Sequence, residues 1–303
     1  MSAGTLPSRA GFVALIGATN AGKSTLINRL VGAKVAIVSR KVQTTRSTIR
    51  GIVTAGATQI VFVDTPGIFS PRRRLDRAMV DAAWGGARDA DLVALLVDAA
   101  TGISEEVNGL LKRLAEIGQP KVLLLNKIDL VKREVLLELT AAANAVVPFD
   151  RTFMISAVTG DGVDDFVGYA ASSLPEGPWL YPEDEISDVP LRSLAAEITR
   201  EKLFDRLHQE LPYQATVETE EWKEQKDGSV RIAQTIFVER DSQKKIVIGK
   251  GGATIKAISM AARKEIGAIA GKPVHLFLFV KVRENWADDP ERYRAMGIEF
   301  PKG

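Results

Sequence analysis

The residues in this sequence best suited to chemistry begin at Gly17 and end at Ser24, in the pattern G-x-x-x-x-G-K-S. An apolar run at 12–16 predicts a strand before them and a run at 25–30 predicts a helix after them, the context that a phosphate-binding loop needs. Glycine lets successive backbone N–H groups point at phosphate oxygens, and the helix N-terminus adds partial positive charge. The expected phosphate-loop contacts are Gly17, Ala18, Thr19, Asn20, Ala21, Gly22, Lys23, Ser24 and Thr25.

Two side chains of this loop have expected roles of their own: Lys23 reaches the β- and γ-phosphates, and the Ser24 hydroxyl ligates Mg²⁺. A second motif, Asp64-Thr65-Pro66-Gly67, follows a predicted antiparallel hairpin of strands at 51–54 and 59–63. An aspartate at the end of a buried strand, before a glycine-containing loop, suits a site that senses a γ-phosphate and Mg²⁺. We therefore expect Asp64 at the metal, with Thr65, Pro66 and Gly67 beside the nucleotide.

A third motif, Asn126-Lys127-Ile128-Asp129, follows the predicted strand at 122–125. The carboxyl edge of an open α/β sheet is where ligands bind. A carboxylate at Asp129 can accept two hydrogen bonds from guanine, from N1–H and from the exocyclic amine, whereas adenine presents a different pattern. Asn126 is expected to brace the loops, and the stem of Lys127 to lie along the base. After the last predicted strand, backbone groups of Ser156 and Ala157 are expected near guanine O6.

Strands and helices alternate through the first half of the chain. Further strands are predicted at 92–97 and 152–155, and helices at 79–88 and 104–117. This alternation predicts a mainly parallel sheet with helices on both faces. The apolar strands read as continuous runs, as expected when both faces of a strand are covered. The predicted fold class is α/β for this half.

Composition limits the remaining possibilities. With 303 residues, 46% of them apolar and 26% charged, the chain is long enough for two domains. The net charge is only +2, so any affinity for nucleic acid must come from a local patch. There are no cysteines, which excludes disulfides, thiolate metal sites and cysteine nucleophiles, and the two histidines do not favour a histidine-rich metal site. We expect no signal peptide and no membrane-spanning segment.

The second half begins after a stretch at 172–188 that contains three prolines and several acidic residues and predicts a linker. The expected order is a helix at 191–210, strands at 215–223 and 230–239, a basic glycine loop, a helix at 253–269 and a strand at 274–282. The loop contains G-x-x-G at Gly249–Gly252, with helical residues on both sides. Between residues 244 and 264 there are six basic residues and no acidic ones. The positive charge is therefore concentrated at this loop.

The element order α-β-β-α-α-β with a G-x-x-G loop resembles the type II KH domain, an α+β fold. In that fold the turn clamps the backbone of about four single-stranded nucleotides. Its glycines keep side chains out of the way, and Lys250 neutralises phosphate. The residues this resemblance assigns to RNA binding are Lys244, Lys245, Ile248, Gly249, Lys250, Gly251, Gly252 and Lys256.

The three motifs of the first half, in this order, resemble the small GTPases of the translation-factor class. Gln43-Thr44-Thr45-Arg46 is similar to switch I of the Era family, which implies that Thr45, with Thr44 as second choice, senses Mg²⁺ and the γ-phosphate. Ile68 stands where Ras-like enzymes place a water-orienting glutamine. In related GTPases with this replacement a potassium ion can stand where an arginine finger would, and the asparagine that ligates it matches Asn20. The resemblance thus implies Lys23, Thr45 and Gly67 as catalytic residues, Mg²⁺ as cofactor and K⁺ as a second ion.

From about residue 11 to residue 297 the chain resembles the Era family, bacterial GTPases with a C-terminal KH domain. The expected domains are a G domain at 9–176, a linker at 177–190, a KH domain at 191–285 and a tail at 286–303, for which simple packing is expected. The resemblance implies a GTP-hydrolysing switch that binds the 3′ end of 16S rRNA during assembly of the 30S subunit. It further implies a cytoplasmic, monomeric protein with peripheral contact at the inner face of the cell membrane.

Two other functions remain open at this level. A nucleoside or small-molecule kinase shares the phosphate loop, but leaves the motif at 126–129 unexplained. A structural RNA-binding protein could bind GTP and scarcely hydrolyse it. Comparing GTP binding with ATP binding distinguishes a kinase from a GTPase. Single-turnover hydrolysis with and without RNA distinguishes a structural RNA-binding protein from a GTPase.

Overall fold

The structure is a computed structural model, and it describes residues 7–39, 41, 44–68, 71, 74–208 and 211–301. The chain forms two compact units. The first consists of Met1–Ala36, Thr45–Asp188 and Tyr293–Gly303, and the second of Ile37–Thr44 and Val189–Arg292. Gln43 of the predicted switch I lies outside the described residues.

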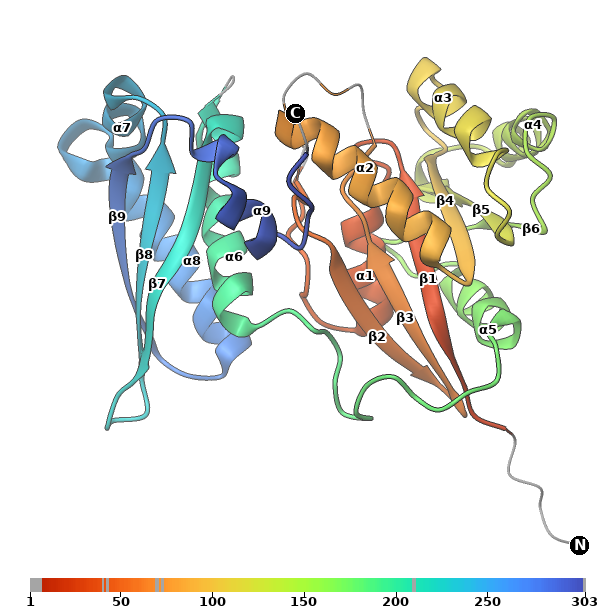
Figure 1. The fold of residues 1–303 in the computed structure, drawn as a ribbon, viewed down its shortest axis with the longest axis horizontal. Helices are drawn as coiled ribbons and strands as arrows, with labels where there is room; N and C mark the ends of the chain where they lie inside the picture. Colours follow the sequence, from red (N-terminus) through yellow and green to blue (C-terminus); the bar gives the residue numbers. More distant parts are fainter. Residues whose placement is uncertain are drawn as a thin grey trace, which may run out of the picture. The chain divides into compact units, whose positions relative to one another are not determined.

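The first unit is built on a six-stranded sheet with the order β2-β3-β1-β4-β5-β6 (Figure 1). All neighbouring strands are parallel except β2 and β3, which form the predicted antiparallel hairpin. Because the parallel strands point the same way, the three motifs that follow β1, β3 and β5 reach one edge of the sheet. The strands are β1 (Arg9–Gly17), β2 (Ile49–Ala55), β3 (Thr58–Asp64), β4 (Leu92–Asp98), β5 (Lys121–Asn126) and β6 (Arg151–Met154).

Helices cover both faces of this sheet, as predicted. One apolar core joins β1, β4 and β5 to α2, α3 and α4, while α1 and α5 contact β2 and β3. The predicted continuous apolar strands are β4 and β5, whose central residues are fully buried. Helices α4 and α5 were not predicted from the sequence. The helices are α1 (Lys23–Val31), α2 (Arg74–Asp89), α3 (Glu105–Leu114), α4 (Arg133–Asn144) and α5 (Val163–Ser173).

The stretch at 179–188, expected as linker, lies along the outer edge of β2. The buried side chain of Gln59 accepts hydrogen bonds from the backbone N–H groups of Leu180 (2.8 Å) and Tyr181 (3.0 Å). Further along, the N–H of Ile52 donates to the carbonyl of Ile186 at 2.9 Å. An edge strand that would otherwise expose a row of backbone groups is therefore partly covered.

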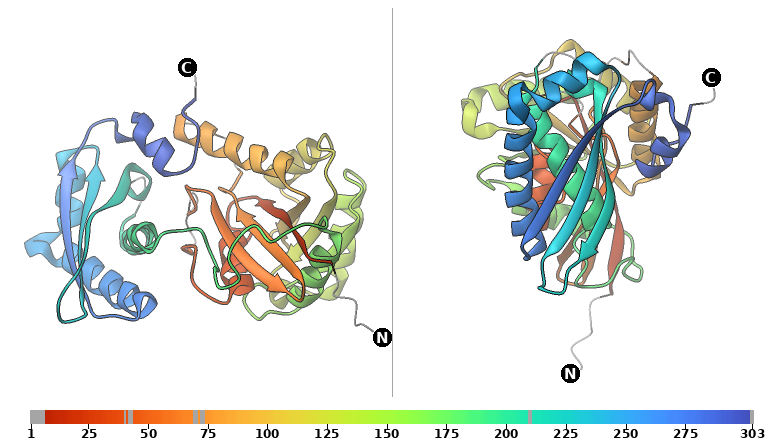
Figure 2. Two further views of the ribbon diagram at one scale, coloured as in Figure 1. Left: turned by 60° about the horizontal axis from the view of Figure 1, so that its bottom comes forward. Right: turned by 90° about the vertical axis from the view of Figure 1, so that its left-hand side faces the viewer.

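The second unit is a three-stranded sheet, β7-β8-β9, with helices packed on one face (Figure 2). Strands β7 and β8 are antiparallel and β8 and β9 parallel, in the predicted order. Helices α6 and α8 bury apolar residues against the sheet. The elements are α6 (Leu191–Arg206), β7 (Ala215–Glu224), β8 (Val230–Val238), α7 (Asp241–Ile248), α8 (Ala253–Ala270) and β9 (Val274–Val282).

The C-terminal segment includes a 3₁₀ turn at Trp286–Asp288 and a short helix, α9 (Pro290–Ala295). Trp286 is buried, and its indole N–H donates to the carbonyl of Gln214 at 3.0 Å. This residue of the tail is therefore packed, as the sequence analysis expects. No helix in the described parts of the chain is long and apolar enough to cross a membrane.

Candidate nucleotide site and nucleic-acid interface

The phosphate loop joins β1 to α1 and is held in a conformation that requires glycine. Gly22 has φ +101°, and a Cβ there would lie 2.3 Å from the side-chain nitrogen of Asn126. At Gly17 a Cβ would lie 2.6 Å from the carbonyl oxygen of Leu96. Both glycines of the motif are therefore fixed by close neighbours, the first by the sheet and the second by the base-recognition motif.

Lys23 lies within this loop with only 6% of its surface exposed. Its Nζ donates to the carbonyls of Gly17 (2.9 Å) and Ala18 (3.0 Å). Burial lowers the pKa of the Lys23 ammonium, and the nearby carboxyls of Asp64 and Glu106 act in the opposite direction. The ammonium therefore lies against the backbone of the loop, and its contact with phosphate stays a prediction.

Three oxygen-bearing side chains, those of Ser24, Thr45 and Asp64, lie close together. The Ser24 hydroxyl is 2.9 Å from the Thr45 hydroxyl and 3.0 Å from Asp64 Oδ2, and the Thr45 hydroxyl is 3.3 Å from Asp64 Oδ2. Asp64 is fully buried, and its Oδ1 has no hydrogen-bond partner among the described residues. Hydroxyl and carboxylate oxygens are the ligands that Mg²⁺ prefers. These three residues are the ones predicted from sequence to bind it, and the unsatisfied oxygen fits a cation.

Burial raises the pKa of Asp64 from 3.8 to about 6, while Lys23 and the two hydroxyls oppose the rise. Burial therefore makes the neutral form of Asp64 easier to reach than in an exposed carboxyl. A divalent cation at this position would favour the charged form. The electrostatics therefore also fit a metal ligand.

Thr44 and Thr45 are the two residues that the sequence offers as the sensor in switch I. Their hydroxyl groups have different partners in the structure. The Thr44 hydroxyl donates to the carbonyl of Lys41 at 2.7 Å, away from the Ser24 and Asp64 cluster. Thr45 is buried within that cluster. Of the two candidates, the geometry favours Thr45.

The second motif lies directly against the phosphate loop. The N–H of Ile68 donates to the carbonyl of Gly17 at 3.2 Å, and a Cβ on Gly67 would lie 3.1 Å from Thr19 Cγ2. The Thr65 hydroxyl donates to the carbonyl of Leu15 at 2.9 Å, so it anchors the strand end. Pro66 and Ile68 are buried. Gly67 is therefore placed with its backbone near the loop that receives phosphate.

Asn126 connects the phosphate loop with the segment after β6. Its side-chain amide donates to the carbonyl of Ala21 at 2.8 Å, and its Oδ1 accepts from the N–H of Ala157 at 3.0 Å. This is the bracing predicted from sequence. Ser156 and Ala157 are buried at the same sheet edge.

The other two residues of this motif are more open. Lys127 has φ +66° and forms an ion pair with Asp98 at 2.5 Å. Asp129 is exposed, in a short 3₁₀ turn, Ile128–Leu130. Its carboxylate is thus accessible to a ligand, and Asp98 is a neighbour of the motif that the sequence pattern did not identify.

Asn20 stands at the apex of the phosphate loop with φ +62°, the left-handed region that asparagine tolerates better than most residues. The fold supports this conformation between Thr19 and Ala21, the latter buried. Asn20 is the residue that the resemblance matched to a potassium ligand, and that role stays a prediction.

Glu106, in the first turn of α3, is a neighbour of the site that sequence analysis did not name. Its carboxylate accepts a hydrogen bond from the N–H of Thr19, and its Oε1 is buried without a hydrogen-bond partner among the described residues. Burial raises the pKa of Glu106, while the Thr19 N–H and the charge of Lys23 oppose the rise. A glutamate two residues after the capping Ser104 predicts only a helix start, so the sequence held no signal for this contact.

The glycine loop of the second unit lies between α7 and α8. Gly249 (φ +75°), Gly251 (φ +58°) and Gly252 (φ +78°) all have left-handed backbones. A Cβ on Gly249 would lie 2.2 Å from the hydroxyl of Thr254, whereas Gly251 and Gly252 face open space. The turn can therefore be approached closely from outside, as the clamp on a nucleic-acid backbone requires.

Cations surround this loop on the surface. Lys245, Lys250 and Lys256 are exposed, and Lys244 is half-buried. The predicted apolar member of the site, Ile248, is half-buried at the end of α7. Ile246 and Met260, on α7 and α8, each expose 56% of their surface and were not identified from sequence. These two side chains add apolar surface beside the lysines, and their exposure could be seen only in the folded structure.

Comparison with family models supports both halves. Residues 12–127 match a family described as 50S ribosome-binding GTPase. Residues 210–287 match the KH domain family.

Comparison with known proteins covers nearly the whole chain. It is 71% identical over 301 residues to the GTPase Era of Rhizobium meliloti, spanning 99% of this chain and 96% of that protein. It is 68% identical over 298 residues to the GTPase Era of Agrobacterium fabrum, spanning 98% and 94%.

Two solved structures agree in fold across both units. A single-residue variant of Aquifex aeolicus Era bound to GDP·AlF₄⁻ has a TM-score of 0.90 at 37% identity, covering 95% of this chain and 99% of that one. Era in complex with MgGDPNP and nucleotides 1506–1542 of 16S ribosomal RNA has a TM-score of 0.90 at 36% identity, covering 96% and 99%. The resemblance inferred from the motifs is confirmed, and the chain belongs to the Era family of GTPases.

Proposed function

We propose that this GTPase binds the 3′ end of 16S rRNA through its KH loop and acts as a GTP-hydrolysing switch in assembly of the 30S subunit. The observation that supports the switch best is the cluster of Ser24, Thr45 and Asp64 beside Lys23. It joins a residue of switch I to the phosphate loop and to the end of β3. A site of this kind responds to whether a γ-phosphate is present.

The residues present fit Mg²⁺. Ser24, Thr45 and Asp64 would hold the ion, which would neutralise charge on the β- and γ-phosphates. Lys23 would bind the same phosphates, and backbone groups near Gly67 would contact the γ-phosphate. A related Era structure contains MgGDPNP, which supports this cofactor. After hydrolysis the contacts of Thr45 and Gly67 with the γ-phosphate are lost, so both segments are released.

Base selection is assigned to Asp129, with Asn126 holding the surrounding loops. The exposed carboxylate can accept the two donors of guanine, and the bonds of Asn126 to Ala21 and Ala157 support a fixed position for the loops around the base. A P-loop kinase would need no such site. The guanine-specific motif and its geometry therefore favour a GTPase over a kinase.

RNA binding is assigned to the turn Gly249–Gly252 and its exposed lysines. Lys245, Lys250 and Lys256 supply positive charge, and Gly251 leaves space for a sugar-phosphate backbone. The Era structure that contains nucleotides 1506–1542 of 16S rRNA supports the choice of RNA. RNA affinity and nucleotide state are then coupled, and such coupling acts in both directions.

The test combines hydrolysis with RNA binding. Single-turnover hydrolysis of GTP and of ATP is measured with and without an RNA carrying the 3′ end of 16S rRNA, together with fluorescence anisotropy of the same RNA. We expect hydrolysis of GTP only, and binding that changes between GDP and a GTP analogue. Hydrolysis of ATP would favour a kinase-like protein. GTP binding without turnover in either condition would favour a structural RNA-binding protein.

We also propose a monovalent cation at Asn20. Ile68 is buried and carries no group that could orient water, so another charge must assist the reaction. Exchange of potassium for sodium at constant ionic strength should slow turnover about threefold to tenfold, and Asn20→Ala should remove the difference. Equal rates of the unchanged protein in both salts would exclude this ion.

A cytoplasmic location, a monomeric state and peripheral contact with the inner face of the membrane remain proposals. The absence of cysteine is compatible with a reducing compartment. The exposed lysines of α7 and α8 supply charge that anionic lipid headgroups attract. Cell fractionation, light scattering and flotation with anionic vesicles test the three statements separately.

A further inference from the structure

The segment Ile37–Thr44, which precedes the sensor Thr45, belongs to the second unit and not to the first. Ile37 is buried in the apolar core that contains Leu194 and Ile198 of α6. The described residues of this segment therefore pack with α6, and Thr44 is the described residue of switch I that belongs to the second unit. Thr45, the next residue, belongs to the first unit.

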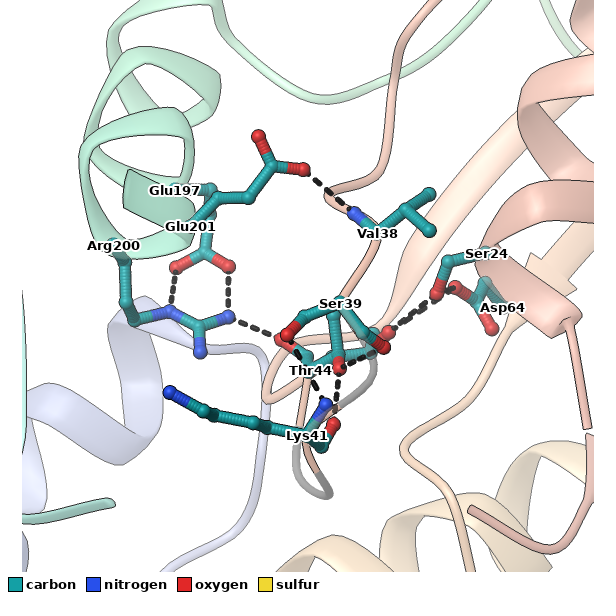
Figure 3. A network of polar contacts seen from close by, with 10 residues as sticks. Ser24, Val38, Ser39, Lys41, Thr44, Asp64, Glu197, Arg200 and Glu201 are labelled. Carbon is teal, nitrogen blue, oxygen red and sulfur yellow. Dashed lines mark hydrogen bonds and ion pairs between the residues drawn. The ribbon is translucent and has the colours of Figure 1, made fainter. Parts of the chain in front are cut away.

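Polar contacts with α6 hold this segment at three places. The N–H of Val38 donates to Glu201 Oε1 at 2.9 Å (Figure 3). The ammonium of Lys41 donates to the carbonyls of Phe204 and Leu207, at the C-terminal end of the helix, where a cation is favoured. The guanidinium of Arg200 donates to the carbonyl of Thr44.

Arg200 is the most specific of these contacts. Its side chain is 1% exposed, and its Nε donates to Glu197 Oε1 at 2.9 Å, while Nη2 pairs with Glu197 Oε2. Its guanidinium also lies 5.0 Å from the ring centroid of Phe204. A buried guanidinium is costly unless its donors are satisfied, and a two-pronged pair with a carboxylate fixes its plane. Arg200 is thus a rigid donor directed at one backbone carbonyl.

That carbonyl belongs to the peptide group that links Thr44 to Thr45. Because a peptide group is planar, fixing the direction of the Thr44 carbonyl also fixes the N–H and Cα of Thr45. The Thr45 hydroxyl at the same time lies 2.9 Å from Ser24 and 3.3 Å from Asp64. Arg200 therefore contacts the residue that directly precedes the Thr45 of the metal-binding cluster.

We propose that Arg200, held by Glu197, is a positioning residue for GTP hydrolysis that acts through the Thr44–Thr45 peptide group. It lowers the cost of ordering Thr45 at the nucleotide, because it fixes the carbonyl of the preceding residue. Since Thr45 contacts the γ-phosphate side of the site, the contribution of Arg200 is specific to GTP. Affinity for GDP does not depend on it.

The test compares Arg200→Gln and Arg200→Lys with a matched control, Arg206→Gln, which changes an exposed arginine on the same helix. We expect Arg200→Gln to lower the hydrolysis rate and the affinity for a GTP analogue at least fivefold, with GDP affinity within twofold of the unchanged protein. Arg200→Lys keeps the charge and loses the two-pronged geometry, so it should recover part of the loss. Arg206→Gln should match the unchanged protein.

A second readout does not depend on turnover. Hydrogen exchange of the backbone amides at residues 44–48 should become faster in Arg200→Gln and stay unchanged in Arg206→Gln. Unchanged exchange and unchanged hydrolysis in Arg200→Gln would overturn the proposal. Equal losses of GTP-analogue and GDP affinity would also overturn it, because they would indicate general damage to the site.

If Arg200→Gln does not fold, Lys41→Met decides the question. Lys41 is only half-buried, and its replacement removes the contacts with Phe204 and Leu207 without leaving a buried charge. The same proposal predicts at least a twofold loss of GTP-analogue affinity with GDP affinity unchanged. No selective loss in Lys41→Met would overturn the proposal.

Discussion

The phosphate loop and the KH loop both end in a glycine that caps a helix from a left-handed backbone, yet their surroundings differ. Gly22 caps α1 with φ +101°, and Gly252 caps α8 with φ +78°. A Cβ on Gly22 would meet Asn126 at 2.3 Å, whereas Gly252 has no heavy atom within 4 Å of the same position. The first loop is enclosed by other motifs, and the second faces outward.

Their lysines differ in the same way. Lys23 is almost fully buried and is bonded to two backbone carbonyls, while Lys250 is exposed. In an enclosed site the side chains are held by close neighbours, so single changes should have large and specific effects. In an open, charged site the electrostatic contributions of single lysines to RNA affinity are screened by salt, so each change should have a smaller effect. This difference determines what each of the following experiments should show.

The largest effect is expected from paired replacements of the two capping glycines. Gly22→Ala adds a methyl group where Asn126 lies and strains a backbone at φ +101°, so GTP affinity should fall more than about 100-fold. Gly252→Ala adds strain in open space, so RNA affinity should fall less than about tenfold. Titration of nucleotide and RNA with both variants measures the difference. Similar losses in the two sites would show that enclosure is not what separates them.

The next effect concerns the base. Asp129→Asn replaces a carboxylate that accepts two donors with an amide that presents one of its own, and should weaken GTP binding by at least about 2 kcal/mol. The same change should strengthen binding of xanthosine triphosphate, whose ring offers an acceptor at that edge. Titration with both nucleotides tests this, and unchanged GTP affinity would falsify the assignment of Asp129. RNA affinity of the nucleotide-free protein serves as the control and should not change.

The comparison also shows which features the sequence could predict. The roles predicted for Gly17, Gly22, Lys23, Ser24 and Asp64 depend on neighbours in the same or a nearby motif, so the spacing alone indicates them. The resemblance already ranked Thr45 above Thr44, and the structure adds the physical reason, because the Thr45 hydroxyl lies beside Ser24 while the Thr44 hydroxyl donates to Lys41.

Contacts between distant parts of the chain could not be predicted. Gln59 binds Leu180 and Tyr181, more than a hundred residues later, and a proline-rich acidic stretch gives no register for such pairing. Arg200 and Glu106 lie on helices whose sequences predict only an amphipathic face and a helix start. Their contacts with Thr44 and Thr19 come from packing between elements, which a single sequence does not specify.

A smaller effect is expected from charge reversal at the open loop. Replacing Lys250 and Gly251 together by aspartate removes one positive charge and adds two negative ones, and should lower RNA affinity at least about tenfold. Each lost phosphate contact should reduce the log–log salt slope by about one. Anisotropy titrations of the 16S 3′ end at several salt concentrations measure both quantities.

The control for that experiment is Lys226→Asp, which reverses an exposed charge on the turn between β7 and β8. It should change RNA affinity less than about threefold because it lies outside the basic segment at 244–264. GTP affinity should be unchanged in both variants. Intact RNA binding after the double replacement would move the interface away from the KH loop, and loss of GTP affinity as well would indicate misfolding.

The smallest effect concerns pH at the enclosed site. Burial raises the pKa of Asp64 from 3.8 to about 6, so the folded protein without metal holds this proton more tightly than the unfolded chain. The favourable contribution of the protonated group is complete below pH 3.8 and is lost as pH rises through about 6. Mg²⁺ needs the carboxylate, so its affinity should change in the opposite direction, falling about twofold between pH 7.5 and 6 and more steeply below.

Calorimetric Mg²⁺ titrations of the GDP complex, corrected for Mg²⁺ binding to free GDP at each pH, measure this slope. Asp64→Asn should bind Mg²⁺ weakly and lose the slope, whereas a flat profile in the unchanged protein would mean that Asp64 is ionised throughout and that burial does not control its charge.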